Sequence, residues 1–306
     1  MGLIVVIAAI LVASGAGAAV ERRLGTSAEQ AADRLLTAVL FAVLPFVVFF
    51  NVVGLEVTAD LAGGLALAWI ALLTAGGLAY HVGRRRWPAP VTGAVVVAAL
   101  AANTGYLGYP LTAIFLGGDR LSEAVAYDIV VAVPMLVLVC FAVGAALGKE
   151  AGESARERAR AFALRNPMLP AFALALVAPD QLAPEVLVEL SQALVFAALP
   201  IGFFAVGVYL AAASPDRLAV PWPGEEITVA VIARIVVAPA ILFLLALPVI
   251  DLPEPHLLLA AMPAGLNTLV VANAFGLDRR IAAGIIAWST AVVLVVAAGL
   301  AVAGLA

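Results

Sequence analysis

The sequence predicts an all-α transmembrane protein. Its ten helices form two inverted repeats of five, in which helices four and nine are broken and cross. Three observations lead to this fold class. The chain of 306 residues is 65% apolar and only 12% charged, against about 25% charged in soluble domains. Its cations gather on alternate connections, and two long apolar segments are interrupted near their middles by the same residue types.

The composition excludes several classes of protein before any motif is considered. No water-soluble core absorbs so much apolar surface, so soluble enzymes, disordered chains and nucleic-acid-binding modules are ruled out. At about 20 apolar residues per crossing, the length suits about ten helices and their connections. The lone Cys140 lies in an apolar run, so neither a disulfide framework nor a thiolate metal site is expected. We expect a lipid bilayer as surroundings, no nucleic-acid partner and no cofactor.

Uncharged stretches define the ten expected spans. They are residues 1–20, 35–55, 61–80, 87–118, 124–147, 161–178, 190–214, 227–250, 257–277 and 281–306. The first is interpreted as a helix and not a signal peptide, because no charged residue precedes Leu3. The sixth is the weakest, since it contains Arg165 and has Pro167 and Pro170 early in it.

The cations orient these spans, because positively charged connections stay on the cytoplasmic side. Of the 16 Lys and Arg residues, fifteen lie in or beside the connections that follow odd-numbered spans, and only Arg120 follows an even one. A helix count wrong by one would scramble this segregation. We therefore expect a multi-pass protein of the cell membrane with both termini extracellular.

The longest hydrophilic connection, residues 148–165, is an expected cytoplasmic linker between two five-helix repeats, 1–147 and 166–306. Leu44-Pro45 followed by Phe49-Phe50 in span two resembles Leu199-Pro200 followed by Phe203-Phe204 in span seven. Because five is odd, the second repeat would cross the membrane in the opposite sense to the first. This is the inverted repeat of many secondary transporters.

Spans four and nine contain matching interruptions. As one straight helix, residues 87–118 would be about 48 Å long, against a hydrocarbon core of about 30 Å. The middle of span four reads Asn103-Thr104-Gly105-Tyr106-Leu107-Gly108-Tyr109-Pro110, and span nine contains Pro263-Ala264-Gly265-Leu266-Asn267-Thr268. Glycine and proline loosen a helix, and the small polar side chains can bond the backbone groups that are freed.

Paired interruptions of this kind indicate a transport site, because unwound backbone at membrane depth must be buried in protein or line a wet cavity. The residues after each break lie at half-helix N-termini, whose N–H groups and dipole favour an anion such as a carboxylate. A packing or kinking role is the alternative. The predicted substrate-binding residues are Asn103, Thr104, Gly105, Tyr106, Pro110, Pro263, Ala264, Gly265, Asn267 and Thr268.

Two ionisable residues within spans are further candidates, for proton or charge handling. Asp128 lies only about 6 Å along the helix from Ala124, so it is either functional or an interfacial carboxylate. Arg234 lies deeper and either reaches inward or extends toward the cytoplasmic side. Ser289-Thr290 either bonds into the core or bonds its own helix.

At these residues the chain resembles the auxin efflux carrier family, the PIN-like membrane transporters. The resemblance is carried by the two interrupted segments, by Asn166-Pro167, by Leu199-Pro200 with Gly207, by Arg234 with Pro239, and by the run from Gly276-Leu277-Asp278 to Ser289-Thr290. It covers nearly the whole chain.

This resemblance implies a scaffold of residues 1–55 and 166–214 that often forms a homodimer, and a transport domain of residues 61–147 and 226–306. It implies an elevator-like movement that alternates access. Asn103 and Pro110 match the first crossing motif, and Pro263 and Asn267 match the second. Sodium coupling, as in the related bile-acid-type symporters, is not expected, because neither crossing segment contains Asp, Glu or Gln. Coupling to a proton gradient or to the membrane potential stays open.

The expected function is therefore secondary transport of a small organic anion, a carboxylate, bound where helices four and nine cross. A membrane sensor built on a transporter-like scaffold is the first alternative. An intramembrane enzyme is the second, and it is disfavoured because no zinc-binding His-Glu-x-x-His or Gly-x-Ser-x-Gly nucleophile motif is present.

Overall fold

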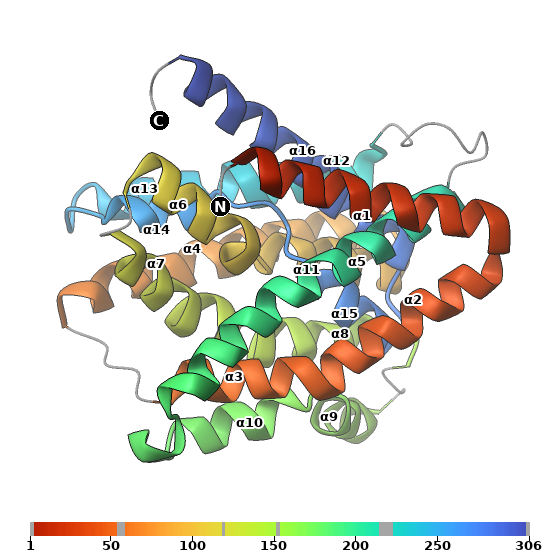
Figure 1. The fold of residues 1–306 in the computed structure, drawn as a ribbon, viewed down its shortest axis with the longest axis horizontal. Coiled ribbons are helices and arrows are strands. Elements are labelled where there is room, and N and C mark those ends of the chain that lie inside the picture. Colours follow the sequence, from red (N-terminus) through yellow and green to blue (C-terminus); the bar gives the residue numbers. More distant parts are fainter. Residues whose placement is uncertain (1–2, 54–58, 118–119, 151–153, 214–222, 304–306) are drawn as a thin grey trace.

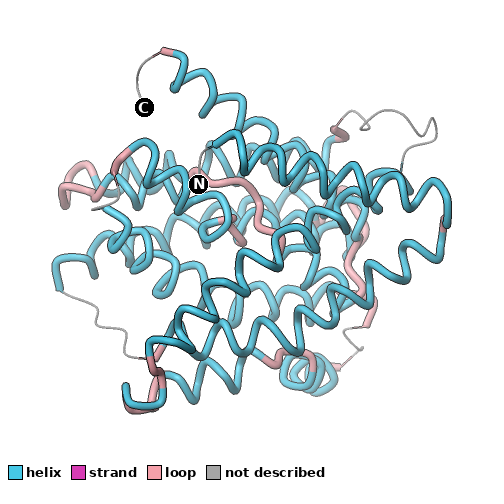
Figure 2. Tube along the Cα trace, viewed as in Figure 1, coloured by secondary structure: helices cyan, strands magenta, loops and turns pink. Residues whose placement is uncertain are grey.

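The computed structural model describes residues 3–53, 59–117, 120–150, 154–213 and 223–303, which are helical nearly throughout (Figures 1 and 2). Within these residues the isolated antiparallel bridge between Ala102 and Ala264 is the only extended pairing. Some expected features lie outside the described residues, namely the span ends Met1, Leu55, Gly118, Ser214 and Ala306 and the cation Arg217.

The helices of the first half lead up to the expected linker. They are α1 (Leu3–Leu24), α2 (Thr26–Ala38), η1 (Val39–Val43), α3 (Leu44–Val52), α4 (Ala59–Gly83), α5 (Ala89–Leu100), η2 (Thr104–Gly108), α6 (Tyr109–Phe115), α7 (Leu121–Tyr127), η4 (Asp128–Ala132), η5 (Met135–Cys140) and α8 (Phe141–Leu147).

The remaining helices begin within that linker. They are α9 (Ala155–Leu164), α10 (Met168–Ala175), η6 (Asp180–Leu182), α11 (Glu185–Ala213), α12 (Glu225–Ile232), η7 (Ala233–Val237), α13 (Ala238–Ala246), α14 (Glu254–Ala260), α15 (Asn267–Phe275) and α16 (Arg279–Val302). The η6 segment is a 3₁₀ turn, and the other η segments are π-helical.

Within the described residues, five helical stretches are long and apolar enough to cross a membrane. They are Thr26–Phe50, Ala62–Gly83, Leu121–Leu147, Glu225–Ala246 and Arg279–Val302, and Ala89–Leu100 and Pro200–Ala212 are shorter apolar helices. These stretches correspond to expected spans two, three, five, eight and ten. The chain is therefore an all-helical, multi-pass membrane protein.

Four of the π-helical segments end two residues before a proline. They are η1, η2, η4 and η7, which precede Pro45, Pro110, Pro134 and Pro239. Proline has no N–H to donate, and its ring collides with the carbonyl group four residues earlier in a regular α-helix. The wider π turn moves that carbonyl group away, so each helix continues past its proline without ending.

The expected sixth span, residues 161–178, is not one helix, and this prediction was wrong. A capping box formed by Ser154 and Glu157 starts α9 inside the expected linker. The chain leaves the helix before Pro167, because a proline disfavours helical conformation at the residue before it. The side chain of that residue, Asn166, accepts from Leu169 N–H (3.2 Å) and donates to Val137 C=O (2.7 Å). The α10 that follows has only eight residues, about 12 Å.

The helices pack as two groups, which also contact each other where α11 packs on α16 and α15 packs on α2. In one, α11 packs along α1, α2 and α3, and α10 packs on α3; Figure 1 shows α11 running diagonally between α1 and α3. In the other, α4, α12, α16 and α8 surround α5, with α13, α14, α7 and α15 packed outside them. The α1 and α11 helices approach closely because glycine has no side chain at two points of contact. A side chain at Gly17 would collide with the carbonyl oxygen of Phe204, and one at Gly207 would collide with that of Ser14.

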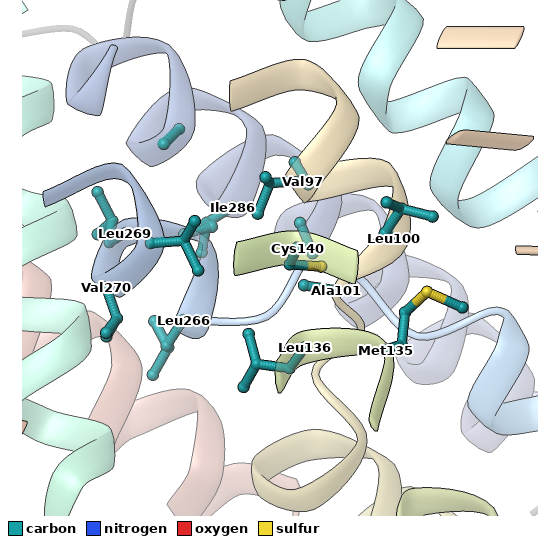
Figure 3. Packing of buried hydrophobic residues seen from close by; sticks show 14 of the residues in the cluster. Val97, Leu100, Ala101, Met135, Leu136, Cys140, Leu266, Leu269, Val270 and Ile286 are labelled. Carbon is teal, nitrogen blue, oxygen red and sulfur yellow. The ribbon is translucent and has the colours of Figure 1, made fainter. Parts of the chain in front are cut away.

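The core of the second group lies around α5, which is buried on every side from Thr92 to Leu100. Figure 3 shows the apolar side chains that pack there, contributed by α5, η5, α15 and α16. Ala101 and Leu266, which lie in the two interruptions, are part of the same buried region. The interruptions are therefore held inside packed protein.

Candidate functional site

The two interruptions lie side by side and bond each other. The first separates α5 from η2 and the second separates α14 from α15. Asn103 N–H donates to Pro263 C=O (2.8 Å), and Gly265 N–H donates to Ala101 C=O (2.8 Å). Backbone groups freed by unwinding would otherwise be costly at membrane depth. Here a carbonyl group of each interruption accepts a hydrogen bond from a freed N–H group of the other.

Gly265 and Ser289 make this contact possible. A side-chain carbon at Gly265 would lie 2.7 Å from Ala102 C=O, so any larger residue would push the two interruptions apart. Ser289 on α16 accepts from Ala264 N–H (3.1 Å) and donates to Ile285 C=O of its own helix (2.6 Å). Both alternatives raised by the sequence are therefore realised at Ser289.

Arg234 lies behind the interruptions and is completely buried. Its Nε donates to Met262 C=O (3.0 Å) and its Nη2 donates to Ala260 C=O. Its Nη1 donates to Ala99 C=O (3.2 Å) and Leu100 C=O (3.4 Å). These carbonyl groups lie at the C-terminal ends of α5 and α14, where the helix dipoles are negative. Arg234 thus reaches inward and does not extend toward the surface.

Residues at the N-terminal ends of the following half-helices line a cavity of about 100 Å³. The first bond of η2 runs from Gly108 N–H to Asn103 C=O (3.1 Å), so the N–H groups of residues 104–107 precede any intrahelical bond. Asn267 opens α15. The cavity is lined by Leu44, Val47, Val48, Ala101, Ala102, Asn103, Thr104, Gly105, Tyr106, Asp128, Ala132, Val133, Leu136, Met168, Gly265, Leu266 and Asn267.

The structure brings most of the predicted site residues to this cavity. Asn103, Thr104, Gly105, Tyr106, Gly265 and Asn267 line it. Pro263 and Ala264 instead form the backbone contact between the interruptions. Pro110 follows the π turn in α6, and Thr268 is fully buried outside the cavity wall.

Asp128 forms part of the cavity wall. It begins η4, directly after α7, and is only partly exposed. Thr104 Oγ1 donates to Asp128 Oδ1, and Tyr109 Oη donates to Asp128 Oδ2 (2.8 Å). Both hydroxyl groups come from the half-helix that begins at the first interruption. The carboxylate is thereby hydrogen-bonded to Thr104, one of the predicted binding residues.

The sequence did not indicate the apolar part of the wall. Leu44, Val47 and Val48 of α3 and Met168 of α10 come from the first group of helices. Such residues are ordinary in apolar spans. The nearest signal was the pair of prolines, Pro45 and Pro167, that lie beside them in the sequence.

A second contact joins the two groups and was also not predicted. Asp33 of α2 accepts from Tyr209 Oη of α11 and pairs with Arg279, the first residue of α16. Asn273 of α15 donates to Asp33 C=O (3.2 Å) and to Thr37 Oγ1 (3.0 Å). We call these five residues the Asp33 cluster. All its members are polar groups that the expected topology places on the cytoplasmic side.

The described residues contain no group of three or more His, Cys, Asp or Glu side chains that could hold a metal ion. His256 is fully buried, with its ring 5.7 Å from that of Tyr127. The profile of a protein family described as "Membrane transport protein" matches residues 3–300, which include both interruptions and the whole cavity wall. No curated protein matches the chain.

Proposed function

Because the chain belongs to this membrane transport protein family, that of the auxin efflux carriers, we propose that it is a secondary transporter of a small organic anion. In this proposal the anion binds in the cavity between the two interruptions and crosses the cell membrane by an elevator-like movement. The observation that carries the proposal is that two half-helix N-termini, opened by Thr104 and Asn267, line one cavity.

The charge of the substrate follows from those helix ends. The free N–H groups of residues 104–107 and the N-terminus of α15 carry positive partial charge toward the cavity. The carbonyl ends of the preceding half-helices are occupied by Arg234 and are not available to a ligand. The cavity therefore favours a carboxylate. The side-chain amides of Asn103 and Asn267 supply further donors at its wall.

The size of the substrate follows from the volume. A cavity of about 100 Å³ is smaller than the roughly 300–1,000 Å³ of sites for drug-sized ligands. It suits an acid of a few carbon atoms. The apolar wall formed by Val47, Val48 and Leu136 suits its hydrocarbon part.

The two contact groups support the elevator-like movement. The packing of α11 on α1, α2 and α3 falls within the expected scaffold, residues 1–55 and 166–214, and the packing around α5 falls within the expected transport domain, residues 61–147 and 226–306, while α11 also packs on α16 across the two. The cavity lies between them, with α3 and α10 on one side and the interruptions on the other. A sliding movement would carry the polar wall past a fixed apolar one. In this arrangement each interrupted helix counts as one of ten spans, and both termini are extracellular.

Uptake into proteoliposomes tests the proposal. Radiolabelled pyruvate, lactate and succinate are offered under imposed proton, sodium and voltage gradients. We expect saturable uptake of at least one acid, lowered at least tenfold by Asn103→Ala and by Asn267→Ala, because each removes an amide donor from the cavity wall. Thr74→Val, on the outer face of α4, is the control and retains uptake. Binding without flux would identify a sensor instead, and wild-type rates in both Asn variants would refute the site.

A further inference from the structure

The cavity contains a carboxylate but no basic side chain to balance it. Among the described residues that line it, Asp128 and Tyr106 are the ionisable groups, and neither Lys nor Arg is present. An anionic substrate would meet the negative charge of Asp128 in surroundings of low dielectric constant, where like charges repel strongly. The partial charge of a helix N-terminus, about half an elementary charge, does not cancel a full one.

No neighbouring element supplies the missing cation. The half-helix after the first interruption places Tyr106 and Tyr109 near Asp128, and its own helix places Tyr127 there. From α4, Trp69 donates to Val130 C=O (3.0 Å), next to the Asp128 turn. The helices of the first group contribute apolar residues to this wall. Arg234 interacts with Tyr127 but does not line the cavity, and its Nε, Nη1 and Nη2 donate to backbone carbonyl groups.

We propose that Asp128 binds a proton together with the substrate, so that the protein is a symporter of a proton and an organic anion, and that Thr104 links the two events. This inference rests on the proposed function. The proton comes from the solution on the side where the anion enters. It leaves with the anion on the other side, so a monocarboxylate and its proton cross as a neutral pair.

The hydrogen bonds give a route for this link. In the ionised state, Thr104 and Tyr109 each donate to one oxygen of Asp128, so the Thr104 hydrogen points away from the substrate. A proton on Oδ1 turns Asp128 into a donor to Thr104 Oγ1. The Thr104 hydroxyl then turns its hydrogen to the cavity and donates to the substrate carboxylate. Tyr109 continues to donate to Oδ2, so no buried hydroxyl loses its partner.

The direction of the pH dependence follows. Low pH on the entry side favours protonated Asp128 and therefore substrate binding, and high pH on the exit side favours release. Between pH 6 and 8 a simple carboxylic acid in solution stays ionised, because its pKa is near 4. A change in uptake over this range therefore reports on the protein and not on the substrate.

Transport in proteoliposomes at clamped voltage is the test, with protein-free liposomes to subtract diffusion of the neutral acid. We expect wild-type uptake of the best acid to be at least tenfold faster at external pH 6 than at pH 8, with internal pH held at 8. Asp128→Asn, which keeps the shape and cannot ionise, should lower this ratio to about one. Thr104→Val should lower it as well, and Thr104→Ser, which keeps the hydroxyl, should restore it.

A measurement on the wild-type protein keeps the inference testable if a variant does not fold. In weakly buffered solution, a pH indicator outside the vesicles should report about one proton taken up for each monocarboxylate. Uptake that is indifferent to pH and takes up no proton would overturn the inference and leave the proposed function standing. Faster transport of alanine than of any simple acid would also overturn it, because Asp128 would then pair with an ammonium group. No flux of any acid under any gradient would refute the proposed function itself.

Discussion

One guanidinium group holds together the carbonyl ends of two half-helices. Arg234 bonds carbonyl groups on both sides of the contact between the interruptions, and it is completely buried. Replacing it by Met leaves several buried acceptors without partners, at about 1–3 kcal/mol each. We expect Arg234→Met to lower the midpoint of thermal unfolding in detergent by more than about 5 °C, followed by tryptophan fluorescence.

The Arg234→Lys variant distinguishes the effect of the positive charge from that of the guanidinium geometry. Lysine keeps the positive charge at the helix ends but lacks the planar fork that reaches several carbonyl groups at once. We expect an intermediate midpoint. Arg84→Met, at an exposed arginine, is the control and should change the midpoint by less than about 1 °C. A midpoint for Arg234→Met equal to that of the control would show that the half-helix ends need no cation.

At the scale of elements, α1 and α11 depend on glycines where they cross. A side chain at Gly207 would collide with Ser14 C=O, whereas one at Gly15 has no atom within 4 Å. Close approach through small residues is a common basis of helix packing in membranes. We expect Gly207→Leu to lower the unfolding midpoint by more than about 5 °C, because overpacking costs about 1–3 kcal/mol or more. Gly15→Leu should be tolerated, and equal midpoints would contradict this account of the crossing.

The Asp33 cluster joins elements that the proposed elevator-like movement would separate. Thr37 of α2 and Asn273 of α15 lie in direct contact, so cysteines at both positions should be cross-linked by a short bifunctional reagent. In a Cys140→Ser background we expect this cross-link to stop uptake and its cleavage to restore it. The control pair replaces Arg86 and Glu225, which form an ion pair within the second group. A cross-link there should leave uptake unchanged, and continued uptake with Thr37 joined to Asn273 would exclude the movement.

At the scale of the whole molecule, the sequence was sufficient to predict both interruptions. Glycine, proline and asparagine at residues 103–110 and 263–268 act on the local backbone. Their tendency to interrupt a helix can therefore be predicted without knowing which other segments pack against them. The same local logic placed Asn103, Thr104 and Asn267, which line the cavity. The class of fold followed from the composition. A single apolar segment inside a bilayer has to satisfy its own backbone hydrogen bonds, and an α-helix does this.

Other features depend on contacts between distant segments, which a single sequence does not reveal. The partners of Asp128 and Arg234 lie on other helices, so their burial could not be distinguished from a place near the interface. The four apolar residues that α3 and α10 add to the cavity wall look like any others in a span. The sixth span was misjudged because residues 161–178 were placed by their scarcity of charge, whereas Asn166-Pro167 separates α9 from α10.

The central claim is that the cavity between the interruptions binds the transported anion, and a cryo-EM structure in lipid nanodiscs tests it most directly. The protein is saturated, at pH 6, with the acid that gives the fastest uptake. We predict density for its carboxylate against the N–H groups of residues 104–107 and the N-terminus of α15, with the hydrocarbon part toward Val47 and Val48. An empty cavity at saturating concentration, or density for the acid at another site only, would contradict the account.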